Sequence, residues 1–120
     1  DWTGQLLELL AMESVHRDWV ARVIRYASGV PSLRHPELEE RMCIFGRWYS
    51  GEGKRLYGDL GGFSTVGRLH QEAHLLGQAL LRAHERGAGT AAAAHDLLEA
   101  RDRFIAGLRQ LQQQVLTRLA

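Results

Sequence analysis

The chain has 120 residues, of which 45% are hydrophobic, so its length and apolar content are those of one domain with its own core. Fifteen basic and 14 acidic residues leave a net charge of +1, which provides no electrostatic footprint for nucleic acid or an anionic membrane surface. A single cysteine excludes an intrachain disulfide, and without an apolar run of membrane-spanning length the chain is expected to be cytoplasmic.

The first predicted helix covers residues 3–29. Its apolar residues recur every three or four positions, as in an amphipathic helix. Thr3 is the expected N-cap and Gly29 the expected stop. His16 falls on the apolar stripe, so its imidazole should face the core.

The second predicted helix runs from Pro36 to about Ser50, because proline suits the first turn of a helix and glycines follow the serine. This helix contains the one thiol of the chain, Cys43, near its middle. The segment 51–63 contains five glycines and is expected to connect this helix to the next.

The third predicted helix begins at Ser64 or Thr65 and stops at Gly87–Gly89. It carries His70 and His74 one turn apart, on the face that its apolar residues share. Two imidazoles in this arrangement are able to bind one metal ion, although the pair alone is a weak signal.

The fourth predicted helix starts after Thr90, continues to the end of the chain and is the longest. Four helices with almost no strand signal predict an all-α, antiparallel four-helix bundle. The last helix also carries apolar residues at the 4-3-4 spacing of a coiled coil, which fits either packing in the bundle or a homodimer. These residues are Phe104, Leu108, Leu111 and Val115.

The expected up-down-up course of the first three helices places one thiol and three imidazoles at the same height. With a rise of about 1.5 Å per residue, all four lie within about two turns of one another. Three imidazoles and one thiolate form a closed tetrahedral set suited to Zn²⁺. The predicted ligands are His16, Cys43, His70 and His74.

Other residues were assigned around this site. Trp19 and Trp48 are expected to pack near it and exclude water, and Glu13, Asp18 and Glu39 are candidates to orient the ligands.

The remaining histidines lie away from this site. His35 precedes a proline and is expected to be exposed. His84 and His95 flank the last turn between helices, where they would face each other at a weak second site.

The motifs resemble those of the CZB family, the chemoreceptor zinc-binding domain of bacteria. The resemblance rests on a histidine followed by a tryptophan (His16 to Trp19), on C-x-x-G-x-W (Cys43 to Trp48) and on H-x-x-x-H (residues 70–74). The family's four zinc ligands map onto the four residues predicted above. The glycine-rich segment 51–63 departs from the family pattern but contains no ligand position.

The resemblance implies a single sensor domain over residues 1–120, with one Zn²⁺ per chain, that forms a homodimer and is regulatory rather than enzymatic. It implies a response to zinc, or to oxidation of Cys43 by an oxidant such as hypochlorous acid. The output would be an attached diguanylate cyclase, which makes cyclic di-GMP, or a cytoplasmic chemoreceptor that controls chemotaxis. A last helix without a stop signal favours the cyclase and an N-terminal place in a longer protein.

Two other classes of protein remain open on the residues alone. A di-iron bundle needs core carboxylates in Glu-x-x-His pairs, whereas Glu72 precedes His74 by two residues and lies on another face. A plain dimerisation module would carry the histidines without a metal. Metal content separates the three readings.

Overall fold

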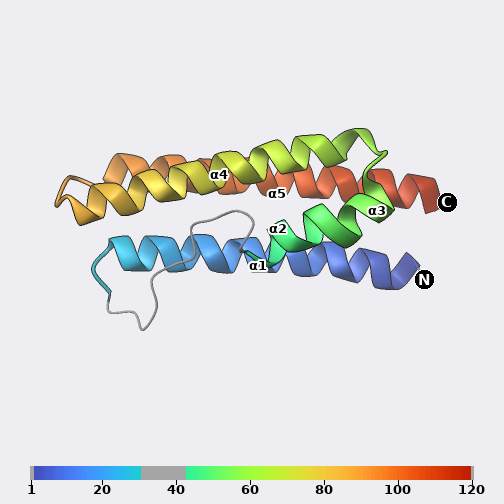
Figure 1. Ribbon diagram of the computed structural model, residues 1–120, viewed down its shortest axis with the longest axis horizontal. Coiled ribbons are helices and arrows are strands. Elements are labelled where there is room, and N and C mark those ends of the chain that lie inside the picture. The colour runs from blue at the N-terminus through green and yellow to red at the C-terminus, as the bar shows by residue number, and fades with distance from the viewer. Residues whose placement is uncertain (1, 31–42, 120) are drawn as a thin grey trace.

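The computed structural model describes residues 2–30 and 43–119, which fold into helices without any strand. Three long helices run side by side along a molecule of 51 × 25 × 18 Å (Figure 1). Their bounds are α1 Trp2–Ala27, α4 Gly61–Glu85 and α5 Ala91–Leu119. The predicted all-α bundle with a long C-terminal helix is therefore confirmed, and none of the described helices is long and apolar enough to cross a membrane.

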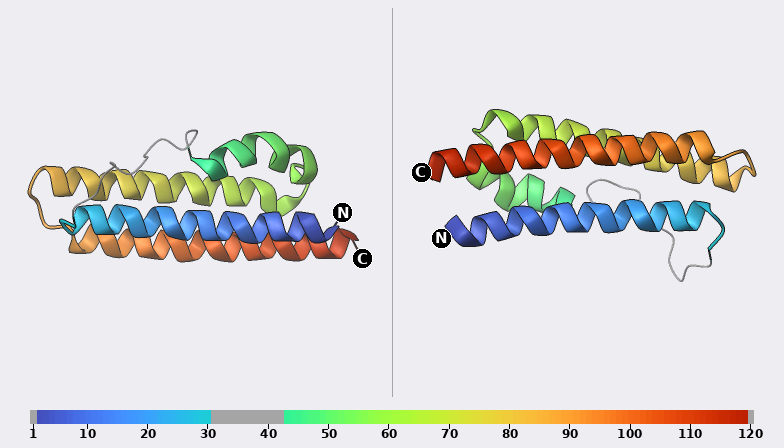
Figure 2. Two further views of the ribbon diagram at one scale, coloured as in Figure 1. Left: turned by 90° about the horizontal axis from the view of Figure 1, so that it is seen from below. Right: turned by 180° about the vertical axis from the view of Figure 1, so that it is seen from behind.

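The fourth member of the bundle is a shorter helical segment that runs from the middle of the molecule toward the end where both chain ends lie (Figures 1 and 2). It comprises α2 (Ile44–Trp48), the π-helical turn η2 (Tyr49–Gly53) and α3 (Lys54–Tyr57). We call it the α2–α3 segment. Residues 31–42 lie outside the described residues, and with them the predicted start at Pro36 and the predicted exposure of His35.

Residues 51–63 lead to α4 as predicted, but they contain more helix than expected, because η2 and α3 continue the helical path to Tyr57. Ring packing explains the glycine at position 53. A Cβ on Gly53 would lie 2.9 Å from the ring of Trp48, so this position is small because an indole lies over it. Helix α4 likewise begins at Gly61, three residues before the predicted cap at Ser64.

The predicted stops of the first and third helices are confirmed. Gly29 and Gly87 have φ angles of 85° and 70°, the left-handed region in which glycine carries no steric cost. After each of them, a backbone N–H returns to the preceding helix, from Val30 to the Arg25 carbonyl and from Ala88 to the Ala83 carbonyl. Helix α1 begins at Trp2, so Thr3 lies inside the helix and is not its N-cap.

The core consists of two apolar clusters along the bundle. The terminal cluster, nearer the chain ends, contains Leu9, Met12, Cys43, Phe45, Trp48, Tyr57, Phe63, Val66, Phe104, Ile105, Leu108, Leu111 and Val115. The hairpin cluster, nearer the α4–α5 turn, contains Trp19, Val20, Val23, Ala27, Leu80, Leu81 and Leu97. On α1 and on α4, the buried histidines lie between the two clusters along the chain.

Candidate metal centre

Three buried histidines form a polar layer between the two apolar clusters. His16 on α1 and His70 and His74 on α4 are 2%, 2% and 3% exposed, and they are the buried polar side chains of the described residues. Each lies on the stripe that its helix turns toward the core, as the helical period predicts. We call these three residues the histidine layer.

Cys43 meets the histidine layer from the start of the α2–α3 segment. Its backbone is extended (φ −82°, ψ 156°), so it is the N-cap of α2 and does not lie inside the predicted helix that would start at Pro36. Its sulfur accepts a hydrogen bond from the backbone N–H of Gly46 at 3.1 Å. A short polar side chain satisfies an unpaired N–H of the first turn in this position, and here the acceptor is sulfur.

Cys43, His70 and His74 offer three ligand atoms that lie within 4.8 Å of one another. The Cys43 Sγ and His70 Nε2 atoms are 3.4 Å apart. Around a tetrahedral zinc ion, bond lengths of about 2.3 Å to sulfur and 2.0–2.1 Å to nitrogen separate these two atoms by roughly 3.5 Å. The spacing of the thiol and the first imidazole is therefore that of two ligands of one ion.

His16 lies beside this group, although it is not one of the three residues whose ligand atoms converge. Its ring centroid is 5.9 Å from that of His70. Its Nε2 atom is buried and has no hydrogen-bond partner among the described residues. A buried polar atom without a partner costs free energy, and binding to a metal ion would remove that cost.

The environment keeps these imidazoles neutral. Burial, followed by the proximity of His74, lowers the pKa of His16 to about 3. Burial, followed by the same neighbour, lowers the pKa of His70 to about 2. A neutral imidazole is the form that donates its lone pair to a metal, so both rings are in the binding form at neutral pH.

Aromatic rings enclose the histidine layer. Trp19 stacks on His74 with ring centroids 4.1 Å apart, as expected of a residue that excludes water. Trp48 instead lies against Phe45 and Tyr57, one ring removed from the histidines. Two further rings that were not predicted at the site lie against the layer: Phe45 lies 4.4 Å from His70 and Phe104 lies 4.1 Å from His16.

Both missed rings had a signal in the sequence. Phe45 lies two residues after Cys43, inside the C-x-x-G-x-W motif. Phe104 is the first residue of the apolar seam on the last helix, and its ring also lies 5.6 Å from His70. Through this residue α5 becomes a wall of the site.

The carboxylates expected to orient the ligands are engaged elsewhere. Glu13 forms ion pairs with Arg17 at 3.4 Å and with Arg109 at 2.9 Å, and thereby ties α1 to α5. Asp18 pairs with Arg22 at 3.2 Å. No contact of either carboxylate with a histidine of the layer is found in residues 2–30 and 43–119, and Glu39 lies outside them.

The two remaining described histidines do not pair with each other. His84 makes an edge contact with Tyr26 at 5.4 Å, and His95 forms an ion pair with Glu99. They therefore form no second metal site at the α4–α5 turn, a possibility that the sequence only weakly suggested.

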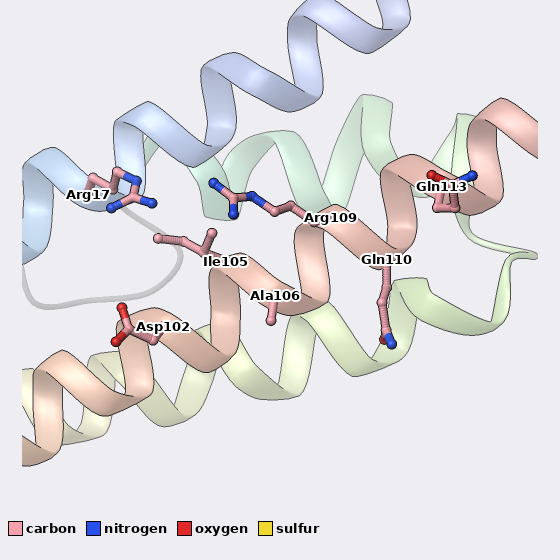
Figure 3. Close-up of a pocket in the computed structure, with 7 residues that line it drawn as sticks. All are labelled: Arg17, Asp102, Ile105, Ala106, Arg109, Gln110 and Gln113. Carbon is pink, nitrogen blue, oxygen red and sulfur yellow. The ribbon is translucent and has the colours of Figure 1, made fainter.

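A surface groove of about 510 Å³ lies between α1 and α5. Figure 3 shows Arg17 from α1 facing Arg109 from α5, with Ile105 and Ala106 between them along α5. No histidine or cysteine lines this groove. The groove is therefore separate from the candidate metal centre.

A scan against protein-family models matches residues 16–81, more than half of the chain, to the family described as the chemoreceptor zinc-binding domain (CZB). The matched range begins at His16 and includes Cys43, His70 and His74. Searches of the curated proteins and of the solved structures return no match.

Proposed function

The chain belongs to the chemoreceptor zinc-binding (CZB) domain family, and on that premise we propose that it is a regulatory sensor domain. Its signal enters at a zinc site built from His16, Cys43, His70 and His74, with one Zn²⁺ per chain. The observation that carries the proposal is the buried convergence of one thiol and two imidazoles, with the unsatisfied Nε2 atom of His16 beside them.

The donor set fits zinc by its chemistry. One thiolate and neutral imidazoles are borderline-soft ligands that suit Zn²⁺, which when bound supplies a +2 charge that stabilises the thiolate. Cys43 must lose its proton to bind, and the N–H of Gly46 already points at its sulfur. No carboxylate is buried among the described residues, so the ligands that a di-iron bundle needs are missing from that part of the core.

The same sulfur provides a second input, because a thiolate is the form of cysteine that oxidants attack. With hypochlorous acid, the Cys43 thiolate gives a sulfenic acid and chloride: the S–O bond forms, the O–Cl bond breaks, and sulfur supplies the two electrons. An oxidised sulfur is a poor ligand. Oxidation of Cys43 would thus open the same site that loss of zinc opens.

The output of the sensor passes through α5 in this proposal. The histidine layer joins α1 and α4, Cys43 joins the α2–α3 segment to them, and Phe104 of α5 packs on His16. The seam residues of α5 that follow Phe104 (Leu108, Leu111 and Val115) are all buried. A change in the layer therefore reaches the core face of α5 directly.

We further propose a cytoplasmic homodimer attached to a diguanylate cyclase, with a chemoreceptor signalling domain as the second candidate output. Because the seam of α5 packs inside the bundle of one chain, the dimer would use another face of the domain. Light scattering of the purified chain tests the dimer. Formation of cyclic di-GMP by the full-length protein, with and without zinc, separates the two outputs.

Metal analysis of the purified protein tests the site. We expect one zinc per chain in the wild type and in His95→Ala, a control that removes an exposed histidine far from the layer. In Cys43→Ser, His70→Ala and His16→Ala, zinc affinity should fall about 100-fold or more. Substitution of residues that only support metal ligands lowers affinity by about 10- to 100-fold, and loss of a ligand should cost at least as much. A wild-type protein that takes up no zinc would leave a metal-free helical module.

The His16→Ala variant decides the size of the ligand set. Near-wild-type affinity in this variant would exclude His16 and leave the three convergent residues as the site.

Zinc release on addition of hypochlorous acid, followed with a coloured chelator, tests the second input. We expect release from the wild type and from His95→Ala at similar oxidant doses.

A further inference from the structure

Trp19 is the residue that joins the two ends of the histidine layer. Its ring stacks on His74 from α4, with centroids 4.1 Å apart and an interplanar angle of 23°. It also lies 6.1 Å from His16, on its own helix, at an angle of 30°. The indole is only 3% exposed and belongs to the hairpin cluster, so its neighbours hold it in place.

Gly77 lies under this indole, one helical turn after His74. A Cβ at this position would lie 2.6 Å from Cη2 of Trp19, and 3.3 and 3.4 Å from Cζ2 and Cζ3. Real Cβ contacts are essentially never this short. The outer edge of the indole therefore occupies the volume that any other side chain at position 77 would need.

The presence of glycine here has no backbone explanation. Gly77 lies inside the 25-residue helix α4, and the glycines with positive φ among the described residues are Gly29 and Gly87. In a helix interior, glycine is about 1 kcal/mol less favourable than alanine. The steric requirement of Trp19 is the remaining reason for it.

The imidazole of His74 needs such a support. The torsion that turns a histidine ring about its Cβ–Cγ bond has broad minima, so the helix backbone alone does not fix where the ring nitrogens point. His70 has a neighbouring phenylalanine and the Cys43 sulfur beside its ring. For His74, the stacked face of Trp19 provides such a restraint, beside an edge contact with the His70 ring at 4.4 Å.

We propose that Trp19 and Gly77 are a positioning pair for the metal centre. The glycine makes the slot, the indole fills it, and the stacked indole sets the orientation of the His74 ring and hence the affinity and coordination geometry of the site. The inference rests on the proposed function, since it requires His74 to be a ligand.

Substitution of the glycine tests the slot. In Gly77→Ala, the indole must move, and we expect zinc affinity to fall about 10-fold or more, in the range that supporting residues of metal sites show. The visible spectrum of the cobalt-substituted protein should change as well, because it reports ligand geometry. A general loss of stability would not alter that spectrum.

Gly107→Ala is the matched control. Gly107 is also buried in the interior of a long helix, but its Cβ would clash with a terminal methyl group of Leu69 at 2.8 Å, which can rotate away, and would meet Val66 at an ordinary contact distance of 3.7 Å. Both substitutions gain the same helix propensity. Zinc affinity and the cobalt spectrum of Gly107→Ala should remain those of the wild type.

A double-mutant cycle with Trp19→Phe completes the test, because phenylalanine lacks the outer indole edge that meets position 77. We expect Trp19→Phe alone to weaken zinc binding and to alter the cobalt spectrum. Gly77→Ala should then add almost nothing in the Trp19→Phe background. Since Trp19→Phe opens space and adds no bulk, it tests the stack even if Gly77→Ala folds poorly.

Two results overturn the inference while the proposed function stands. One is a Gly77→Ala protein that matches Gly107→Ala in affinity and spectrum, while the wild type holds one zinc that His74→Ala loses. The other is an equal cost of Gly77→Ala in both backgrounds. A wild type that binds no zinc overturns the proposed function and the inference together.

Discussion

The two apolar clusters on either side of the histidine layer are built differently. The terminal cluster draws on four helical segments and buries five aromatic rings, whereas the hairpin cluster, within the described residues, is aliphatic apart from Trp19. The α2–α3 segment accounts for much of the contrast, because it supplies three of those rings together with the thiol. The two sides of the metal centre are therefore closed by different means.

This difference separates two tasks. On the terminal side, the site is closed by a short segment that starts at Cys43, whose sulfur lies 3.4 Å from His70 Nε2 and whose Phe45 ring lies on His70. On the hairpin side, it is closed by an indole in a slot between two long helices. If Cys43 is a ligand as proposed, loss of its sulfur would remove one link between the α2–α3 segment and the layer, while the ring contacts of Phe45 and the Trp19 indole would remain.

The largest expected effect comes from removing a ring that touches the site. Phe104→Ala should lower the free energy of unfolding by about 4 kcal/mol and Leu80→Ala by about 3 kcal/mol, as for other large core side chains. Only the first should also weaken zinc binding, since Phe104 packs on two imidazoles of the layer. Denaturant titration of the metal-free proteins and zinc competition measure both quantities. Equal loss of zinc affinity in both variants would show that the two clusters do not act separately.

The histidine layer itself should make the metal-free protein sensitive to acid. The pKa values of His16 and His70 lie near 3 and 2 in the folded state, against 6.5 for an ordinary histidine. Below pH 6.5 the unfolded chain therefore binds protons at these two imidazoles, whereas the folded chain does not. The free energy of unfolding falls as the pH drops through 6.5. Between pH 7 and 5.5 we expect a loss of about 2 kcal/mol from the two groups together.

Denaturant titrations at several pH values measure this slope. His16→Phe should reduce the slope by about half, because one of the two groups is gone. His95→Ala keeps both buried rings and should leave it unchanged. A flat profile in the wild type would mean that the layer takes up protons while folded.

A smaller effect is expected at the end of the terminal cluster. The Gln114 side chain on α5 accepts a hydrogen bond from the backbone N–H of Gly62 at 2.9 Å, which satisfies a donor in the first turn of α4. Gln114→Ala should cost about 1 kcal/mol of stability, and the exposed neighbour Gln113→Ala close to zero. Thermal unfolding of the two variants side by side measures the difference. Equal stability of the two variants would show that the hydrogen bond between Gly62 and Gln114 contributes nothing measurable to stability.

The sequence predicted the histidine layer well because helical periodicity is a local property. His16 and the His70–His74 pair lie on apolar stripes, and a stripe that faces the core in any bundle brings its histidines inside. The stops at Gly29 and Gly87 were predictable for a similar reason, since the left-handed conformation favours glycine whatever surrounds it.

Features that depend on distant packing were predicted poorly. The segment after Ser50 contains enough glycine to indicate a loop, yet it is helical to Tyr57, and the glycine at position 53 makes room for the Trp48 ring. The position of Cys43 at a helix start was missed because the apolar spacing runs on across it. Phe104 was recognised as a seam residue, but its contact with His16 depends on how α5 is rotated against α1.

The histidine layer also fixes the alignment of the long helices along their axes. A helix that slides by one turn moves its side chains by about 5.4 Å, which would carry an imidazole into a cluster of leucine and valine side chains. Within residues 2–30 and 43–119, the buried polar residues are the three histidines of this layer. An all-leucine interior would tolerate such a slip, whereas this interior penalises it because a misplaced imidazole loses its polar neighbours. The register of α1 against α4 is thus encoded at one level of the bundle.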